Sequence, residues 1–142
     1  MNLATLRIIW GALLGSHFLY GLGLYVIIKQ SAGATEEVSP GLLPIICSIG
    51  IVLFFAAIYL PRFFLKKEKK HVPSNSRIED LIPKFIAPFV IRLALFEAVA
   101  LMGFCLAFMT KEMQFYYPFA AVSIVAYILN FPTEEKIQKA FN

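Results

Sequence analysis

One acidic residue lies inside a long apolar segment of this chain. Glu97 stands near the middle of the apolar run from Phe89 to Met109. A carboxylate at the centre of a bilayer costs at least ~2.5–3.5 kcal/mol on insertion scales. A membrane protein that keeps one there neutralises it, pairs it or uses it to take up and release an ion. Glu97 is therefore the first candidate for function.

His17 is the one basic side chain that the sequence places at a matching depth. It lies about ten residues into the first apolar run and Glu97 about nine into the third, so both are ~13–15 Å from the same membrane face at 1.5 Å per residue. Three interpretations of Glu97 stay open: a neutral acid, a partner of His17, and an ion-binding site. Arg92 is about 140° round the helix from Glu97, and we expect it to extend to the headgroup region instead.

The other polar side chains inside apolar runs show no catalytic spacing. No nucleophile, base and orienting group recur together, and no glycine-rich phosphate loop is present. The chain has no CxxC pair, and its few cysteines and histidines lack the spacing of zinc ligands. We therefore expect no enzyme, no cofactor and no metal. Cys47 and Cys105 have similar predicted depths, so a disulfide stays open, but free thiols acting as small apolar side chains are favoured.

The amino-acid composition indicates the environment of this chain. Of its 142 residues 59% are hydrophobic, whereas soluble domains contain ~45–50% apolar residues. The net charge of +4 comes from few, unevenly placed residues, and no basic run is interleaved with aromatic residues. We predict a membrane protein and no nucleic-acid partner.

The predicted fold is an all-α bundle of four transmembrane helices, forming a single domain over residues 1–142. Helices are preferred because only they and closed barrels satisfy their own backbone in lipid, and the two-residue alternation of barrel strands is missing. A cytoplasmic loop, 65–88, and a short tail, 132–142, complete the chain. The predicted spans are approximately residues 8–28, 42–64, 89–110 and 115–131.

Basic residues predict the orientation, because Lys and Arg concentrate in cytoplasmic flanks. One side has only Lys29 and Lys111, and the other has ten. Both termini should therefore be cytoplasmic, in a bacterial inner membrane or its equivalent. Tyr116 and Tyr117 are expected as anchors at the outer interface. The ten are Arg7, Arg62, Lys66, Lys67, Lys69, Lys70, Arg77, Lys84, Lys136 and Lys139.

A cleaved signal peptide is an alternative interpretation of the first run. The residues Ala32-Gly33-Ala34 match a small-residue cleavage pattern. The apolar run before them has ~21 residues, however, and the apolar part of a signal peptide has 7–15. An uncleaved first span is therefore the prediction.

The cytoplasmic segments predict two short interfacial helices. Ser76 to Glu79 has the form of a capping box, and apolar residues from Ile78 to Phe85 follow it at helical spacing. In the tail, Thr133 is the expected helix cap. The basic residues near these helices predict contacts with anionic lipid headgroups, at ~1 kcal/mol per residue. They are Lys66, Lys67, Lys69, Lys70, Arg77 and Lys84.

Small residues predict close helix packing, which matters because lipid provides no hydrophobic drive for association. They form a GxxxG step in the first run and a second series in the third. If the first and third helices touch through them, a hydrogen bond between His17 and Glu97 follows. Packing within one chain and packing between copies both stay open. The residues are Gly11, Gly15, Ser16, Ala94, Ala98, Gly103 and Ala107.

The segment from Ala94 to Phe108 reads ALFEAVALMGFCLAF. It resembles the carboxylate-bearing helix of the rotary ATP synthase c subunits, which has the pattern A-L-x-E-A-x-A-x-x-G. The resemblance covers about 20 of the 142 residues. It implies that Glu97 is an ion-carrying carboxylate, that Ala94, Ala98 and Gly103 allow close packing, and that copies of the chain form a ring.

Two functions are therefore expected. The first is a homo-oligomer, with a ring as one form, built through small-residue faces and binding a proton or cation at Glu97. The second is a non-transporting four-helix organiser or accessory subunit, which acts through lipid and partner contacts of its basic cytoplasmic face.

Overall fold

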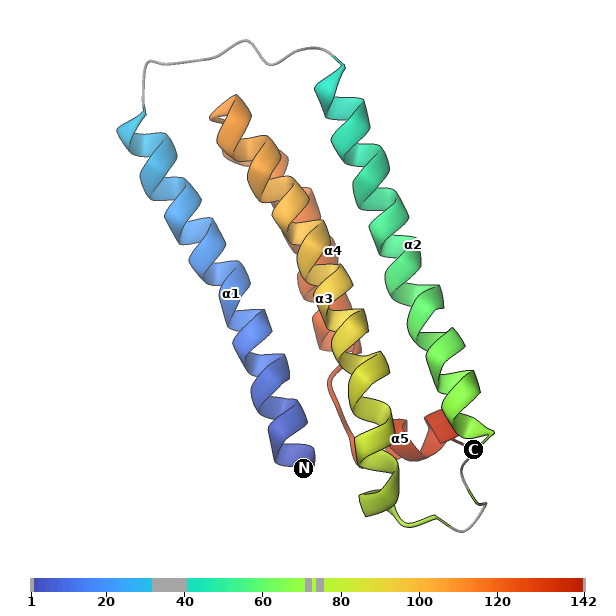
Figure 1. The fold of residues 1–142 in the computed structure, drawn as a ribbon. Coiled ribbons are helices and arrows are strands. Elements are labelled where there is room, and N and C mark those ends of the chain that lie inside the picture. The colour runs from blue at the N-terminus through green and yellow to red at the C-terminus, as the bar shows by residue number, and fades with distance from the viewer. Residues whose placement is uncertain (1, 32–40, 71–72, 74–75, 142) are drawn as a thin grey trace.

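The computed structural model describes residues 2–31, 41–70, 73 and 76–141, and this part of the chain is helical without strands. Its all-α architecture confirms the predicted fold class. Figure 1 shows the arrangement of the elements. They are α1 (Leu3–Gln30), α2 (Leu42–Lys69), α3 (Ile78–Thr110), the 3-10 turn η1 (Met113–Phe115), α4 (Tyr116–Leu129) and α5 (Glu134–Phe141).

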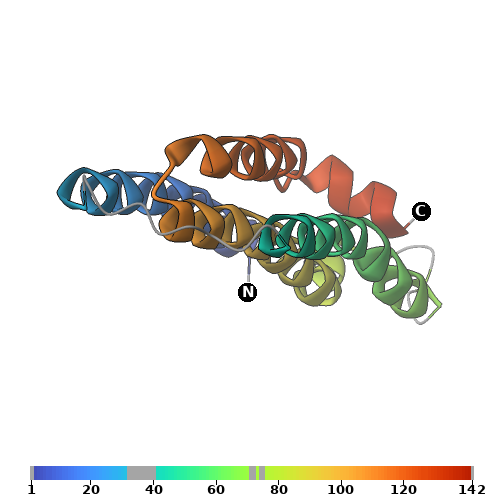
Figure 2. The same cartoon turned by 90° about the horizontal axis from the view of Figure 1, so that it is seen from above.

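Helix α3 is the centre of the bundle. It packs against α1, α2, α4 and α5. In the two views α1 and α2 flank α3, while α4 covers one face of this layer and α5 crosses its lower end (Figures 1 and 2). Helices α1 and α3 run in one direction and α2 and α4 in the other (Figure 1). Helices α1 and α4 also contact each other directly.

Three helices, α1, α2 and α3, are long and apolar enough to cross a membrane, which agrees with a membrane location. A fourth crossing exists if η1, α4 and α5 are counted as one span, bent by 83° between Met113–Leu129 and Glu134–Phe141. Helix α4 alone has 14 residues, or ~21 Å, against a hydrocarbon core of ~30 Å. The chain thus has three to four candidate spans.

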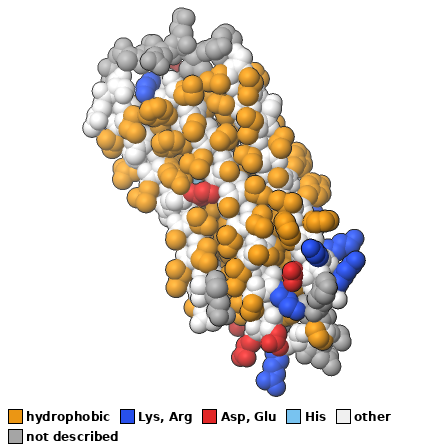
Figure 3. Space-filling view, in the orientation of Figure 1, with side chains coloured by type: hydrophobic (Ala, Val, Ile, Leu, Met, Phe, Trp, Pro, Cys, Tyr) orange, Lys and Arg blue, Asp and Glu red, His pale blue; other side chains and the backbone are white. Residues whose placement is uncertain are grey.

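Charged side chains gather at the end of the bundle where both chain ends lie (Figures 1 and 3). An apolar band covers most of the face drawn in Figure 3, and acidic atoms interrupt it at mid-height. An even number of membrane crossings would place both chain ends at the same end of the bundle, where they lie in the structure (Figure 1).

Residues 78–85 are helical, as predicted, but they are the first turns of α3 and not a separate interfacial helix. The backbone cap is Arg77, without a side-chain bond, and the hydroxyl of Ser76 donates to the carbonyl of Pro73 at 2.8 Å. Pro83 and Pro88 each remove one backbone donor, yet the helix continues. Its apolar residues are buried on both sides of the prolines, and this packing outweighs the lost bonds. These residues are Leu81, Ile82, Phe85 and Phe89.

The predicted cap of the tail helix is confirmed. The amide of Lys136 donates to Thr133 Oγ1 at 3.3 Å, and α5 starts at Glu134. Its residues Ile137 and Phe141 are buried in the core cluster at the lower end. The ammonium of Lys136 donates to the carbonyl of Leu129 at 2.9 Å, which caps the end of α4. Helix α5 thereby closes this end of the bundle.

Both cysteines are free thiols: Cys47 is partly buried and Cys105 is exposed. The cleavage pattern at Ala32 to Ala34 lies outside the described residues.

Candidate functional site

Side chains from two helices converge on the carboxylate of Glu97, which α3 holds near the middle of the bundle. The hydroxyl of Ser16 on α1 donates to Oε1. The hydroxyl of Tyr127 on α4 lies 3.2 Å from Oε2, and His17 Nδ1 lies 3.3 Å from the same oxygen. Glu97 is 8% exposed and His17 is 2% exposed. The contact with His17 is the one that the matching depths predict.

Each of these donors also has a backbone carbonyl within reach. Ser16 Oγ lies 2.6 Å and His17 Nδ1 3.0 Å from the carbonyl oxygen of Leu13. The Tyr127 hydroxyl lies 3.0 Å from the carbonyl oxygen of Leu93. Each donor can therefore bond to the carboxylate when Glu97 is ionised and to a carbonyl when Glu97 is neutral. These three donors therefore stay satisfied in both charge states, which avoids the cost of leaving them buried and unpaired.

The neighbours of His17 determine its tautomer. Because Nδ1 faces two oxygen atoms, it carries the hydrogen. Nε2 is buried and has no hydrogen-bond partner among the described residues. A hydrogen on Nε2 would be a buried, unsatisfied N–H. The ring of Tyr127 meets the imidazole edge-on at 5.1 Å and keeps it in place.

Further hydrogen bonds hold α1, α3 and α4 around this site. Tyr116 donates to the carbonyl of His17 at 2.7 Å, and its ring lies against Gly21, where an added Cβ would be 3.3 Å away. Trp10 Nε1 donates to the carbonyl of Tyr127 at 2.8 Å. Ser123 donates to the carbonyl of Phe96. The polar groups of α1 and α4 thus bond to backbone carbonyls across the helix boundaries.

Tyr127 was not predicted as a site residue, and Tyr116 is packed inside the bundle. Tyr116 was expected at the interface but is 4% exposed, whereas its neighbour Tyr117 is 60% exposed. The available signal was the spacing of Tyr116, Ala120, Ser123 and Tyr127, which places all four on one face of α4. All four are buried. That face had to meet the bundle, because a polar hydroxyl in lipid needs a partner.

The small residues separate into two groups. Gly103 and Ala107 are buried, and a Cβ at Gly103 would lie 2.5 Å from Phe119 Cβ, so α3 and α4 approach closely there. By contrast, nothing lies within 4 Å of an added Cβ at Gly11 or Gly15. Ala94 is exposed and Ala98 is half-buried. Helices α1 and α3 therefore meet at Ser16, His17 and Glu97 rather than through Gly15 and Ala94.

Arg92, which was expected to extend to the headgroup region, contacts the end of α4. It is half-buried, and its Nη1 donates to Asn130 Oδ1 at 2.9 Å. Asn130 is the C-terminal cap of α4, and its side-chain amide donates to the carbonyl of Ala126 at 2.7 Å. The cation therefore compensates the negative end of the α4 dipole. Sequence spacing could not show this contact, because it joins two helices.

The basic residues predicted to bind headgroups lie away from Glu97, at the lower end of the bundle. Lys66, Lys67 and Lys69 occupy the last turn of α2, and Lys70 caps it. Arg77 and Lys84 belong to the start of α3. Cations in the last turn of a helix are favoured by its dipole, so the α2 cluster also has a local structural reason.

Comparison of the chain with models of protein families, with characterised proteins and with solved structures finds no match. The fold defines a helical bundle with three to four candidate membrane spans, and the site is a carboxylate that accepts hydrogen bonds from α1 and α4. No cluster of three or more metal-ligating His, Cys, Asp or Glu side chains occurs among the residues described. The likeness of Ala94 to Phe108 to the c subunits stays a prediction.

Replacing Glu97 by leucine tests whether the bundle needs the carboxylate. The donors of Ser16, His17 and Tyr127 each keep a carbonyl acceptor, and hydrogen bonds inside membrane proteins average only ~0.6 kcal/mol. We therefore expect a free energy of unfolding within about 1 kcal/mol of the wild type, measured by steric trapping in lipid bicelles.

The control for this measurement is Leu93→Ala, which opens a cavity at a fully buried position on the same helix. It should lower the free energy of unfolding by about 2–5 kcal/mol. A comparable loss in Glu97→Leu would show that the carboxylate is a structural requirement.

Proposed function

We propose that this chain is an integral membrane protein that binds and releases a proton at Glu97 and assembles with copies of itself through α1. The observation that carries the first part is the double set of acceptors around the carboxylate. Three donors face Glu97, and each has an alternative carbonyl. The second set lets the three donors stay paired when the charge of the carboxylate changes.

The spacing of the site favours a proton over a larger cation. Ser16 and Tyr127 contact the carboxylate directly, and His17 Nδ1 is 3.3 Å from it. A bound cation would have to stand between these groups and the carboxylate at its own coordination distance of ~2 Å or more from each ligand. The donors would then have to turn away, because N–H and O–H hydrogens face the position of the cation.

The surroundings of Glu97 are polar but carry no fixed charge. Ser16, His17 and Tyr20 face it from α1 and Tyr127 from α4, and the hydroxyl of Tyr20 also interacts with the carboxylate. No lysine or arginine bonds to Glu97 within the described part of the chain. About 10% of its side chain stays exposed, which allows exchange with the surroundings at the boundary of α1 and α3.

Carbodiimide labelling tests the proton-binding role. Dicyclohexylcarbodiimide reacts with the neutral acid in apolar sites, so labelling of Glu97 should fall as the pH rises. Ser16→Ala removes a donor to the ionised form, worth about 1.5–3 kcal/mol for a charged acceptor. It should increase the labelled fraction at a fixed pH, as read by mass spectrometry of the labelled peptide.

Glu97→Gln is the control, and its peptide should not be labelled at any pH. Failure of the wild type to label between pH 5 and 9 would contradict the proposal. Protection by Na⁺ at constant pH and ionic strength would show that the ligand is a cation and not a proton.

Three glycines of α1 that pack against nothing within the described part of the chain support self-association. Gly11, Gly15 and Gly23 have nothing within 4 Å of an added Cβ, so this chain does not use them for its own packing. Gly15 lies about 160° round the helix from His17, on the side away from α3. Small residues allow two helix backbones to approach closely in lipid, and a second copy is the partner for which we argue.

The double variant Gly11→Leu, Gly15→Leu tests this assembly. Its side chains would separate the two helices, and the dissociation constant should rise at least tenfold, the equivalent of about 1.4 kcal/mol. Single-molecule photobleaching in liposomes of graded protein density measures it. Ala121→Leu, an exposed position on α4, is the matched control. Equal association of both variants and the wild type would exclude the α1 face.

A second candidate function rests on the basic end of the bundle. The predicted headgroup-binding residues occur at the end of α2 and the start of α3, and Lys and Arg atoms gather at this end in Figure 3. An anionic membrane surface attracts such a cluster. The chain would then organise lipid or partner proteins at that surface without transport.

The triple variant Lys66→Gln, Lys69→Gln, Lys70→Gln tests the lipid role. At ~1 kcal/mol per residue the preference for phosphatidylglycerol over phosphatidylcholine should fall by up to about 100-fold, measured by native mass spectrometry of lipid-bound species. Lys111→Gln, at the other end of α3, should leave it unchanged. A preference unaltered in the triple variant would contradict this role.

A further inference from the structure

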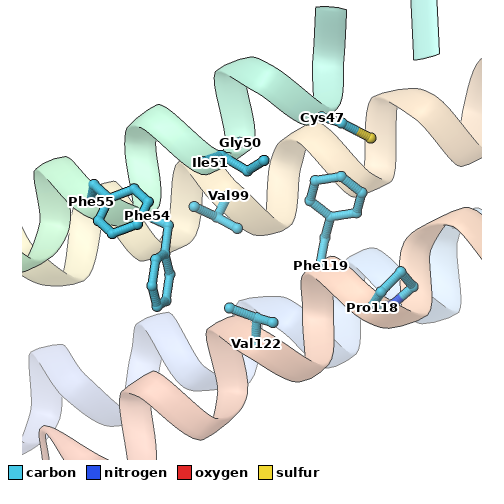
Figure 4. A pocket seen from close by; sticks show the side chains of 9 residues that line it. All are labelled: Cys47, Gly50, Ile51, Phe54, Phe55, Val99, Pro118, Phe119 and Val122. Atoms are coloured by element: carbon cyan, nitrogen blue, oxygen red, sulfur yellow. The ribbon is translucent and has the colours of Figure 1, made fainter. Parts of the chain in front are cut away.

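A groove runs between α2 and α4 on the side of α3 that faces away from Glu97. Its volume is about 400 Å³, and its lining is almost wholly apolar. Val99 of α3 forms the floor, Phe54 and Phe55 come from α2, and Val122 from α4 (Figure 4). Phe55 and Val122 are exposed while Val99 is buried, so the groove opens from the core to the surface of the bundle.

The groove exists because one aromatic ring separates α2 from α4. Phe119 of α4 is held between two glycines: an added Cβ would lie 2.9 Å from its Cε1 at Gly50 of α2, and 2.5 Å from its Cβ at Gly103 of α3. The ring therefore fills the space between the helices at this level. Beyond it, the short side chains of Val99 and Val122 do not fill the space, and the groove results (Figure 4).

The size of the groove limits what it can bind. On α2 it extends from Cys47 to Phe55, or ~12 Å at 1.5 Å per residue. A helix of that length with side chains, about 10 Å wide, occupies roughly 900 Å³, so a helix of a second copy could insert only a few side chains. A volume of about 400 Å³ is that of a site for a small molecule.

The apolar lining of the groove favours a hydrocarbon ligand. An apolar cavity of this kind stays free of water and takes up apolar molecules. The groove lies in the apolar parts of α2, α3 and α4, where the exposed large side chains are hydrophobic. In a membrane-embedded chain the surrounding molecules are lipids, and a single acyl chain is narrow enough to lie lengthwise between α2 and α4.

We propose that this groove binds one acyl chain of a membrane phospholipid, as a site distinct from the lipids that surround the rest of the bundle. The inference rests on the membrane location in the proposed function and is independent of proton binding. Val99 lies about 200° round α3 from Glu97, so the two sites occupy opposite faces of the helix. The lipid would fill the space between α2 and α4 and so complete the packing of α2.

A photoreactive lipid tests the proposal in the intact chain. Phosphatidylcholine with a diazirine midway along one acyl chain is diluted into nanodiscs of unlabelled phosphatidylcholine, and adducts are mapped by mass spectrometry. Labelling of the groove residues Ile51, Phe55 and Val122 should saturate with the mole fraction of probe. Labelling at Val52, which is exposed on α2 outside the groove, should rise linearly. This comparison needs no variant.

Filling the groove provides the second measurement. Val122→Trp should lower labelling of the α2 groove residues at least fivefold, while Val125→Trp, at an exposed position of α4 outside the groove, should leave it unchanged. Glu97→Gln should also leave it unchanged, which separates this inference from proton binding. Linear labelling at every position would overturn the proposal. So would groove adducts unaffected by Val122→Trp, or crosslinks to a second copy in place of lipid.

Discussion

The hydrogen bonds at Glu97 fix the depth at which α1, α3 and α4 meet, while apolar packing supplies most of their stability. Inside an apolar band a carboxylate needs donors, and α1 and α4 supply them through Ser16, His17 and Tyr127. Lipid provides no hydrophobic drive for helices to associate, so polar contacts help to specify which helices meet and at what depth. Trp10 adds a further hydrogen bond from α1 to the backbone of α4.

Helix α3 can serve several neighbours because its faces carry different side chains. Glu97 faces the polar cluster, Gly103 allows the close approach of α4, and Val99 forms the floor of the groove beside α2. Successive side chains point about 100° apart round a helix. Positions only a few residues apart on α3 therefore face different neighbours. Helix α4 is too short to cross the band alone, and the α3 contacts, with the cap by Arg92 at its end, hold it in the bundle.

The proposed roles are independent in space. Proton binding uses the boundary between α1, α3 and α4, self-association uses the opposite side of α1, and the acyl chain uses the groove beside α2. The basic residues lie at one end of the bundle. A substitution at one of these places therefore leaves the direct contacts at the others unaltered. Through Ser16, His17 and Tyr127, the proposed proton site contacts both α1 and α4.

The sequence by itself determined the helical class, three of the candidate spans, the cap at Thr133 and the matching depth of His17 and Glu97. These follow from local apolar length and from the fixed rise of a helix. Only the tertiary structure decided which face of each helix meets another. In the structure Tyr116 and Tyr127 face the inside of the bundle, and Arg92 contacts Asn130. Gly11 and Gly15 have nothing within 4 Å of an added Cβ, and residues 78–85 are part of α3. A helix rotated about its axis keeps the same sequence pattern, and its rotation is set by the neighbours that satisfy its polar groups.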